Sequence, residues 1–188
     1  MIVVYVNSMS DTDTFHAVYE NLDCKLMYNP TREDVVNALE NNPGETLLAF
    51  GHGTPYGLLN DDMTGFVIDM SMVEQLRNRE VIGIWCYASL FAEKAGLNGF
   101  FTNMFISNSI EASCMGCGYW KDEILFEQNT KFAVAINDLI RREVPMNQWV
   151  QTLYDGCDKH MNFVEFNYSK LAYFPKQFVG ELSDPEGV

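Results

Sequence analysis

Basic residues are scarce in this chain of 188 residues. Lysine and arginine together number 12, against 26 aspartates and glutamates, so the formal net charge is −14. A protein that binds a nucleic-acid backbone needs clustered lysines and arginines to displace counterions. The composition therefore argues against a nucleic-acid partner, and it would favour a basic peptide or protein as a substrate or partner.

Long apolar runs are also missing. No segment reaches the ~20 apolar residues of a membrane helix, and the opening MIVVYVNSMS lacks the positive stretch of a signal peptide. Five cysteines, an odd number scattered along the chain, fit reduced thiols better than a disulfide framework. These features predict a cytoplasmic protein with no membrane partner.

The chain has no internal repeat, low-complexity tract or linker-like segment, and its length suits one domain. We therefore expect a single domain over residues 1–188. No Walker-type or GxGxxG loop follows the first apolar run, so nucleotide binding has no support. We expect no cofactor.

Strand and helix patterns alternate along the sequence. The pattern predicts strands over 2–7, 24–29, 46–50, 81–85, 102–107 and 161–168. It predicts helices over 11–21, 30–42, 71–79, 88–95, 121–142 and 146–155, and a hairpin within 55–70. Such alternation implies right-handed crossovers. The expected fold is an α/β three-layer sandwich, with a mainly parallel sheet of about six strands and helices on both faces.

Two of the predicted strands each end at a residue with useful chemistry. The run TLLAF (46–50) is followed by Gly51-His52-Gly53, and VIGIW (81–85) is followed by Cys86. Ligands of open parallel sheets bind beyond the carboxyl ends of the strands. If these two strands are neighbours, their axes lie about 4.8 Å apart, and His52 and Cys86 come within reach of each other.

A histidine beside a cysteine is an arrangement for nucleophilic catalysis. The imidazole can lower the thiol pKa or accept its proton, and the thiolate is the nucleophile. The backbone N–H groups of Gly53 and Cys86 would then form an oxyanion hole. Each residue also has a structural interpretation, because histidines are common in turns and cysteines are often buried in cores. Their joint placement at the ends of consecutive strands favours the catalytic one.

The segments LLAFGHG and IGIWCYAS resemble the His-Gly and Cys motifs of the caspase-like (clan CD) cysteine peptidases. This group includes caspases, metacaspases, clostripain, gingipains, legumain, separase and bacterial CHAT domains. The order of His before Cys and the predicted hairpin after the third strand are also similar. The resemblance covers roughly residues 1–155, and it implies a peptide-bond hydrolase with His52 as general base or acid and Cys86 as nucleophile.

The sequence departs from this family at the substrate pocket. Caspases carry Gln-Ala-Cys-Arg/Gln-Gly where this chain has Ile84-Trp85-Cys86-Tyr87-Ala88, so specificity for aspartate is not implied. Clostripain-like enzymes and metacaspases bind a basic side chain with an aspartate two residues before the cysteine, and that position is Ile84 here.

Other residues are candidates for the substrate pocket. Asp61, Asp62 or Glu111 would supply a negative charge from the loops, although turn chemistry explains the aspartate pair more simply. The stretch TNMFISNSIEAS (102–113) resembles the pocket wall of the family, which makes Ser107 and Asn108 further candidates.

Two alternatives to a cysteine endopeptidase stay open at this point. One is a catalytically inactive caspase-like interaction or regulatory module, since a fold alone does not establish activity. The other is a zinc-stabilised protein, because Cys114-x2-Cys117 and Cys157-x2-His160 form an acceptable ligand set. We expect no metal, because the predicted strands place the two pairs at opposite rims of the sheet, ~17–20 Å apart.

Overall fold

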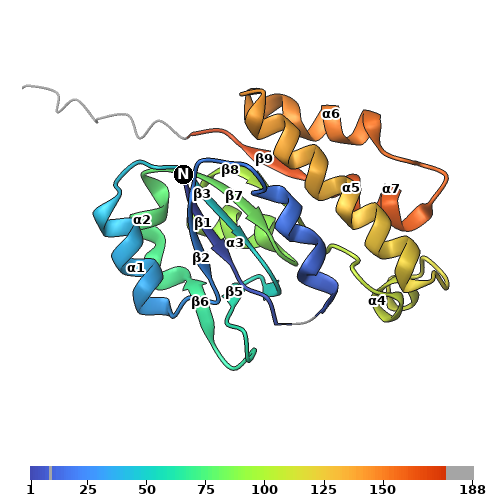
Figure 1. The fold of residues 1–188 in the computed structure, drawn as a ribbon, viewed down its shortest axis with the longest axis horizontal. Helices are drawn as coiled ribbons and strands as arrows, with labels where there is room; N and C mark the ends of the chain where they lie inside the picture. The colour runs from blue at the N-terminus through green and yellow to red at the C-terminus, as the bar shows by residue number, and fades with distance from the viewer. Residues whose placement is uncertain (9, 177–188) are drawn as a thin grey trace, which may run out of the picture.

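The computed structural model describes residues 1–8 and 10–176, which are built around a six-stranded sheet (Figure 1). The strands are β1 (Ile2–Tyr5), β2 (Lys25–Tyr28), β3 (Leu47–Phe50), β7 (Glu80–Ile84), β8 (Asn98–Phe101) and β9 (Ala172–Phe174). Their order is β2-β1-β3-β7-β8-β9, and every neighbouring pair is parallel except β8 and β9. The α/β class and the mainly parallel sheet of six strands are confirmed.

The helical segments follow the strands in the expected alternation. They are η1 (Ser10–Val18), α1 (Arg32–Asn41), η2 (Met70–Met72), α2 (Val73–Arg77), α3 (Ala88–Ala95), α4 (Ser109–Cys114), α5 (Asp122–Arg141), η3 (Met146–Gln148), α6 (Trp149–Gly156) and α7 (Asn162–Tyr168). None of the helices in the described part of the chain combines the length and the apolar character of a membrane span.

Two apolar cores lie on opposite faces of the sheet. One contains buried side chains of α1, α2 and α3, and the other contains those of η1, α5, α6 and α7. Figure 1 shows α1 and α2 on one side of the sheet and α5, α6 and α7 on the other. Strands β1, β3 and β8 are buried along their whole length because both faces are covered. Helices therefore cover both faces, as the sequence predicts.

The first α-helix begins where its sequence indicates. Thr31 caps α1 by accepting a hydrogen bond from the Asp34 N–H, and the Asp34 carboxylate accepts one from the Thr31 N–H at 3.0 Å. This reciprocal pair satisfies two N–H groups that a helix start leaves without partners. The helix predicted over 30–42 is confirmed.

Two predicted strands are wrong. The fifth strand is β8 (Asn98–Phe101), and residues 102–108 form the connection that follows it. Residues 161–168 form α7 instead of a strand, with buried side chains at 163, 164, 167 and 168 in helical spacing. The final strand is the short antiparallel β9, and the first helical segment, η1, is a 3-10 helix.

The predicted hairpin is part of a second sheet. Strands β4 (Gly53–Thr54), β5 (Gly57–Leu59) and β6 (Phe66–Asp69) pair antiparallel between β3 and α2. The small sheet begins at Gly53, immediately after His52, so His52 lies between the end of β3 and the start of β4.

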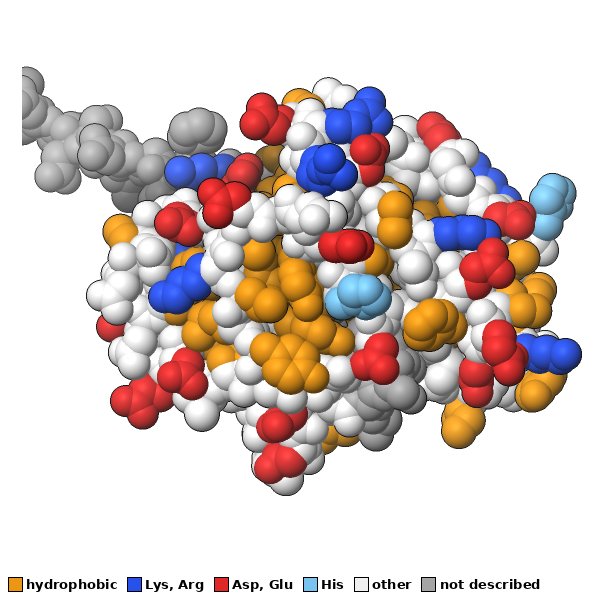
Figure 2. Space-filling model, viewed as in Figure 1, with side chains coloured by type: hydrophobic (Ala, Val, Ile, Leu, Met, Phe, Trp, Pro, Cys, Tyr) orange, Lys and Arg blue, Asp and Glu red, His pale blue; other side chains and the backbone are white. Residues whose placement is uncertain are grey.

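Strand β2 forms one edge of the main sheet. Its side chains Leu26 and Tyr28 are 43% and 56% exposed, and Figure 2 shows an apolar area over this edge with charged side chains around it. The Tyr28 ring packs edge-on against the buried Tyr5 ring, with centroids 5.2 Å apart, so the exposed edge continues an aromatic cluster of the core.

Candidate active site

His52 and Cys86 follow two strands that are paired in register. β3 and β7 are neighbours, and their last residues, Phe50 and Ile84, are direct partners. The Gly51 N–H donates to the Ile84 carbonyl at 3.2 Å, which extends the pairing by one step. His52 and Cys86 each lie two residues beyond the paired ends, so they emerge at the same edge of the sheet.

Both side chains line one small cavity. Its volume is about 20 Å³, and its walls are Phe15, Gly51, His52, Ile84, Trp85, Cys86, Phe105 and Ser107. His52 and Cys86 are both half-buried, so neither is sealed inside the core. This cavity contains the residues on which the sequence-based hypothesis depends, at the edge of the sheet where ligands of parallel sheets bind.

Gly51 is needed for the strand to reach this edge. Its φ of +148° lies in a region that favours glycine. A Cβ there would lie 2.5 Å from the Val6 carbonyl oxygen, at the end of β1. The glycine before His52 therefore allows the chain to turn closely against the neighbouring strand.

Gly53 allows a different close approach. A Cβ on Gly53 would lie 2.1 Å from Cδ1 of Trp85, so the indole ring occupies the space beside this glycine. The Leu59 N–H donates to the His52 carbonyl at 2.9 Å, and Gly53 faces Leu58 at the next position. In an antiparallel pair, this alternate position directs the N–H away from the partner strand. The Gly53 N–H is therefore not used in the β4–β5 pairing.

A sharp turn carries Cys86 from β7 into α3. Tyr87 has a left-handed backbone, with φ of +67°, which is uncommon for a residue other than glycine and is often found at functional sites. The buried Thr102 stabilises this turn, because its hydroxyl donates to the Trp85 carbonyl at 2.8 Å. The Ser89 N–H donates to the Thr102 carbonyl at 2.8 Å and links the start of α3 to the same residue.

The segment after β8 contributes Phe105 and Ser107 to the walls of the same cavity. The Cys86 thiol donates to the Phe105 carbonyl, with Sγ and oxygen 3.6 Å apart. The Phe105 ring lies against Phe15 of η1 and Phe132 of α5, with centroids 5.9 and 4.9 Å away. The cysteine is thus held against a buried aromatic wall.

Of the predicted pocket residues, Ser107 lines the cavity and two others support it. Ser107 donates through both its N–H and its hydroxyl to the Glu111 carboxylate, at 2.7 and 2.9 Å. Asn108 caps α4 by accepting a hydrogen bond from the Glu111 N–H at 3.0 Å. Glu111 and Asn108 are outside the lining of the cavity and fix the backbone that presents Ser107.

This capping role predicts a measurable loss of stability. We expect Asn108→Ala to lower the free energy of unfolding by about 1 kcal/mol, because the start of α4 loses its side-chain acceptor. Urea denaturation measures the change. Ser113→Ala, an exposed position in the same helix, is the matched control and should leave stability nearly unchanged. Equal stabilities of the Asn108→Ala and Ser113→Ala variants would contradict the capping role.

Asp61 and Asp62 lie in the turn between β5 and β6, and neither lines the cavity. The Asp62 carboxylate accepts a hydrogen bond from the Thr64 N–H at 2.9 Å and another from the Thr64 hydroxyl. These bonds, the hydroxyl first, hold the pKa of Asp62 below its usual value. The turn interpretation of the aspartate pair accounts for the contacts of Asp62.

All five cysteines lie in the described part of the chain, and no disulfide joins any two of them. No group of three or more histidine, cysteine, aspartate and glutamate residues suited to a metal ion occurs within residues 1–8 and 10–176. The reasoning that separated the two zinc-ligand pairs is nevertheless wrong. The Asn162 amide donates to the Cys117 carbonyl at 2.9 Å, so the loop carrying Cys117 lies beside the start of α7.

No protein-family model matches this chain, and no curated protein matches it either. The resemblance to caspase-like peptidases therefore rests on the His-Gly and Cys motifs and stays a prediction. The structure adds that the two motifs line one cavity.

Sequence reasoning missed the residues that complete the site. Phe15 comes from a segment without a chemical motif. Thr102 and Phe105 both fall within the strand that the sequence predicts over 102–107. Threonine and phenylalanine are common core residues, so the local sequence around these three residues does not indicate a site. Only the register of β7 and β8 shows that Thr102 lies beside the turn that carries Cys86.

Proposed function

We propose that this chain is a caspase-like cysteine endopeptidase that uses Cys86 as nucleophile and His52 as general base. The observation that carries the proposal is the shared cavity at the carboxyl ends of β3 and β7. The order of His before Cys and the small antiparallel sheet between β3 and α2 agree with the family resemblance. A peptide or protein is the substrate.

The reaction would proceed in two steps. His52 accepts the thiol proton while the Cys86 sulfur attacks the scissile carbonyl carbon. The tetrahedral intermediate collapses to a thioester as the amine leaves with a proton from His52. Water, deprotonated by the imidazole, then hydrolyses the thioester and releases the new carboxylate. The Cys86 thiol is regenerated.

The proposed oxyanion hole consists of the backbone N–H groups of Gly53 and Cys86. The Gly53 N–H points away from β5, so the β4–β5 pairing does not use it, and Gly53 lies next to His52 but outside the lining of the small cavity. One well-placed donor of this kind contributes roughly 10²–10³ in rate. The left-handed turn at Tyr87 sets the direction of the backbone immediately after Cys86.

Labelling with peptidyl acyloxymethyl ketones tests the proposal. A set of these reagents that differ at the P1 side chain would alkylate the thiolate of an active cysteine. We expect mass spectrometry to find Cys86 labelled at least about 10-fold faster than the other four cysteines. The His52→Ala variant should label about 10²-fold more slowly, because no imidazole takes the thiol proton.

His160→Ala is the matched control, since His160 is exposed and lies outside the cavity. It should label at the rate of the unmodified protein. Equal labelling of all five cysteines, or a rate that is insensitive to His52, would contradict the proposal. The reagent that reacts fastest identifies the preferred P1 side chain.

The second candidate is a catalytically inactive caspase-like interaction module, and the small cavity favours it. A volume of about 20 Å³ holds about one water molecule, and Phe15 and Phe105 fill the remaining space. A peptidase must therefore bind the peptide across the surface of this site or displace one of these rings. Absence of labelling by the whole reagent set, in a folded protein, would support this second candidate.

A further inference from the structure

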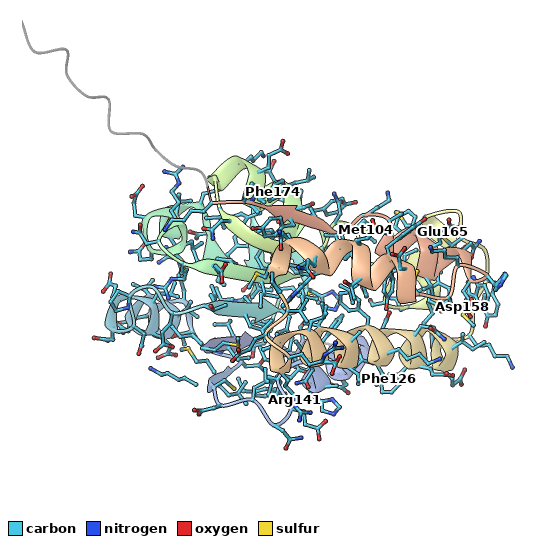
Figure 3. All side chains as sticks on the ribbon, turned by 90° about the horizontal axis from the view of Figure 1, so that it is seen from above. Met104, Phe126, Arg141, Asp158, Glu165 and Phe174 are labelled. Carbon is cyan, nitrogen blue, oxygen red and sulfur yellow. The ribbon has the colours of Figure 1, made fainter. Side chains whose placement is uncertain are left out.

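A larger cavity lies in the helical layer, apart from the His52 and Cys86 site. It has a volume of about 330 Å³ and lies between α5, α6 and α7. Figure 3 shows α5, with Phe126 and Arg141 labelled, beside the segment that carries Asp158 and Glu165. The volume falls within the range of small-ligand sites, roughly 300–1,000 Å³. None of its lining residues belongs to the lining of the small cavity.

The walls of this cavity are mainly apolar. Leu139 of α5, Leu153 of α6 and Val164 of α7 are all buried and contribute the inner surface, and Ala135 contributes from the half-buried side of α5. An apolar enclosure built by three helices suits an aromatic or branched hydrocarbon group.

Two buried polar groups line the same cavity. Gln128 is 8% exposed and Tyr168 is 7% exposed. Within the described ranges, no hydrogen bond joins the Gln128 amide or the Tyr168 hydroxyl to another residue. Burial raises the pKa of Tyr168, with a smaller contribution from Cys157, so the hydroxyl keeps its proton and can donate. Neither group is among the fully enclosed polar atoms that lack a partner in the described residues, so both can be reached from the cavity and can bond a ligand there.

The charged side chains in the lining of the cavity balance, because Lys131 and Arg142 are matched in number by Asp138 and Asp158. Both cations are also in ion pairs. Arg142 pairs with Asp138 at 3.0 Å, and Lys131 pairs at 2.7 Å with Glu127, which lies outside the lining. No excess of positive charge is present to attract an anion, so the cavity suits an uncharged ligand.

We propose that this cavity binds an uncharged small molecule with an aromatic or branched apolar body and a carboxamide or hydroxyl end. The apolar body contacts Leu139, Leu153 and Val164. The polar end exchanges hydrogen bonds with the Gln128 amide and the Tyr168 hydroxyl. This site does not depend on the proposed peptidase activity.

The ligand site is connected to the wall of the small cavity by the residues next to its polar groups. Asn129, which follows Gln128, donates to the Ser107 carbonyl at 3.5 Å. Asn167, which precedes Tyr168, accepts from the Ile106 N–H at 2.7 Å and donates to the Ile106 carbonyl at 3.0 Å. A ligand that shifts α5 or α7 therefore acts on the backbone beside Phe105 and Ser107.

Titration with benzamide tests the site, because benzamide is uncharged and joins an aromatic ring to a carboxamide. We expect saturable shifts of the backbone amide resonances of Leu139, Leu153 and Val164, with a Kd on the order of a millimolar for so small a probe. Smaller shifts at Ile106 and Ser107 should follow the same binding curve. Sodium benzoate should bind at least about fivefold more weakly, since no cation is free to meet its charge.

Substitutions at two neighbouring positions of α5, one inside the cavity and one outside it, test whether benzamide binds in the cavity. Ala135→Phe fills the cavity and should weaken benzamide binding at least about tenfold, whereas Val134→Phe, at the neighbouring exposed position, should leave it unchanged. Gln128→Leu should weaken benzamide binding by removing the buried amide. No saturable shift at the cavity, or equal binding by the Ala135→Phe and Val134→Phe variants, would overturn the proposal. Shifts that leave Ile106 and Ser107 unaffected would overturn the connection to the small cavity.

Discussion

Replacement of Cys86 by alanine is expected to lower kcat/KM for a peptide substrate by at least about 10³-fold, because no other group in the small cavity can form the thioester. The substitution removes only the sulfur, whose thiol donates to the Phe105 carbonyl, and the cavity walls stay in place. A fluorogenic peptide that contains the P1 residue found by the labelling experiment measures the loss.

Cys114→Ala is the matched control for this loss. Cys114 is exposed at the end of α4 and lies outside the cavity, so the variant should keep the full kcat/KM. Circular dichroism and thermal unfolding should show that both variants are folded. Turnover that survives in Cys86→Ala would place the nucleophile elsewhere and exclude the proposed mechanism.

The sequence was sufficient to predict most of the sheet and the pair of candidate catalytic residues. Continuous apolar runs identify β1, β3 and β7, because strands covered on both faces bury nearly all their side chains; among these three strands only Glu80, the first residue of β7, is exposed. Consecutive parallel strands end at the same edge, which brings His52 and Cys86 together. The strand assignments depend on local sequence patterns, and the pairing of His52 with Cys86 depends on the rule that parallel strands end at the same edge of a sheet.

The remainder depends on contacts between residues distant in the chain. The sequence of β8 is Asn-Gly-Phe-Phe, and its glycine interrupts the apolar pattern by which a strand is recognised. The glycine is required by a contact with the neighbouring strand, because a Cβ on Gly99 would lie 1.9 Å from the Val81 carbonyl oxygen. The cavity wall is held by Asn167, which is 61 residues away from Ile106. Local sequence patterns do not predict hydrogen bonds between residues so far apart in the chain. For this reason the sequence predicts a strand over 102–107, where the structure has the wall of the small cavity.

Substitution of Gly53, the glycine of the proposed oxyanion hole, is expected to have a large effect on stability. We expect Gly53→Ala to lower the free energy of unfolding by roughly 2–3 kcal/mol. The new Cβ would lie 2.1 Å from Cδ1 of Trp85 and 2.8 Å from the Gly57 carbonyl oxygen. The indole has no space to withdraw, because it is 2% exposed and its other edge lies against Gly83. Thermal unfolding should show a Tm decrease of about 5–10 °C.

The same substitution also tests the site, because Trp85 is bonded directly to Cys86. A displaced indole would shift the backbone of Cys86 and slow its alkylation, even in the folded protein at low temperature. Gly156→Ala is the matched control: a Cβ there meets nothing within 4 Å, and alanine in a helix should be neutral or slightly stabilising. If Gly53→Ala were as stable and as reactive as Gly156→Ala, the close contact between Gly53 and Trp85 would not shape the site.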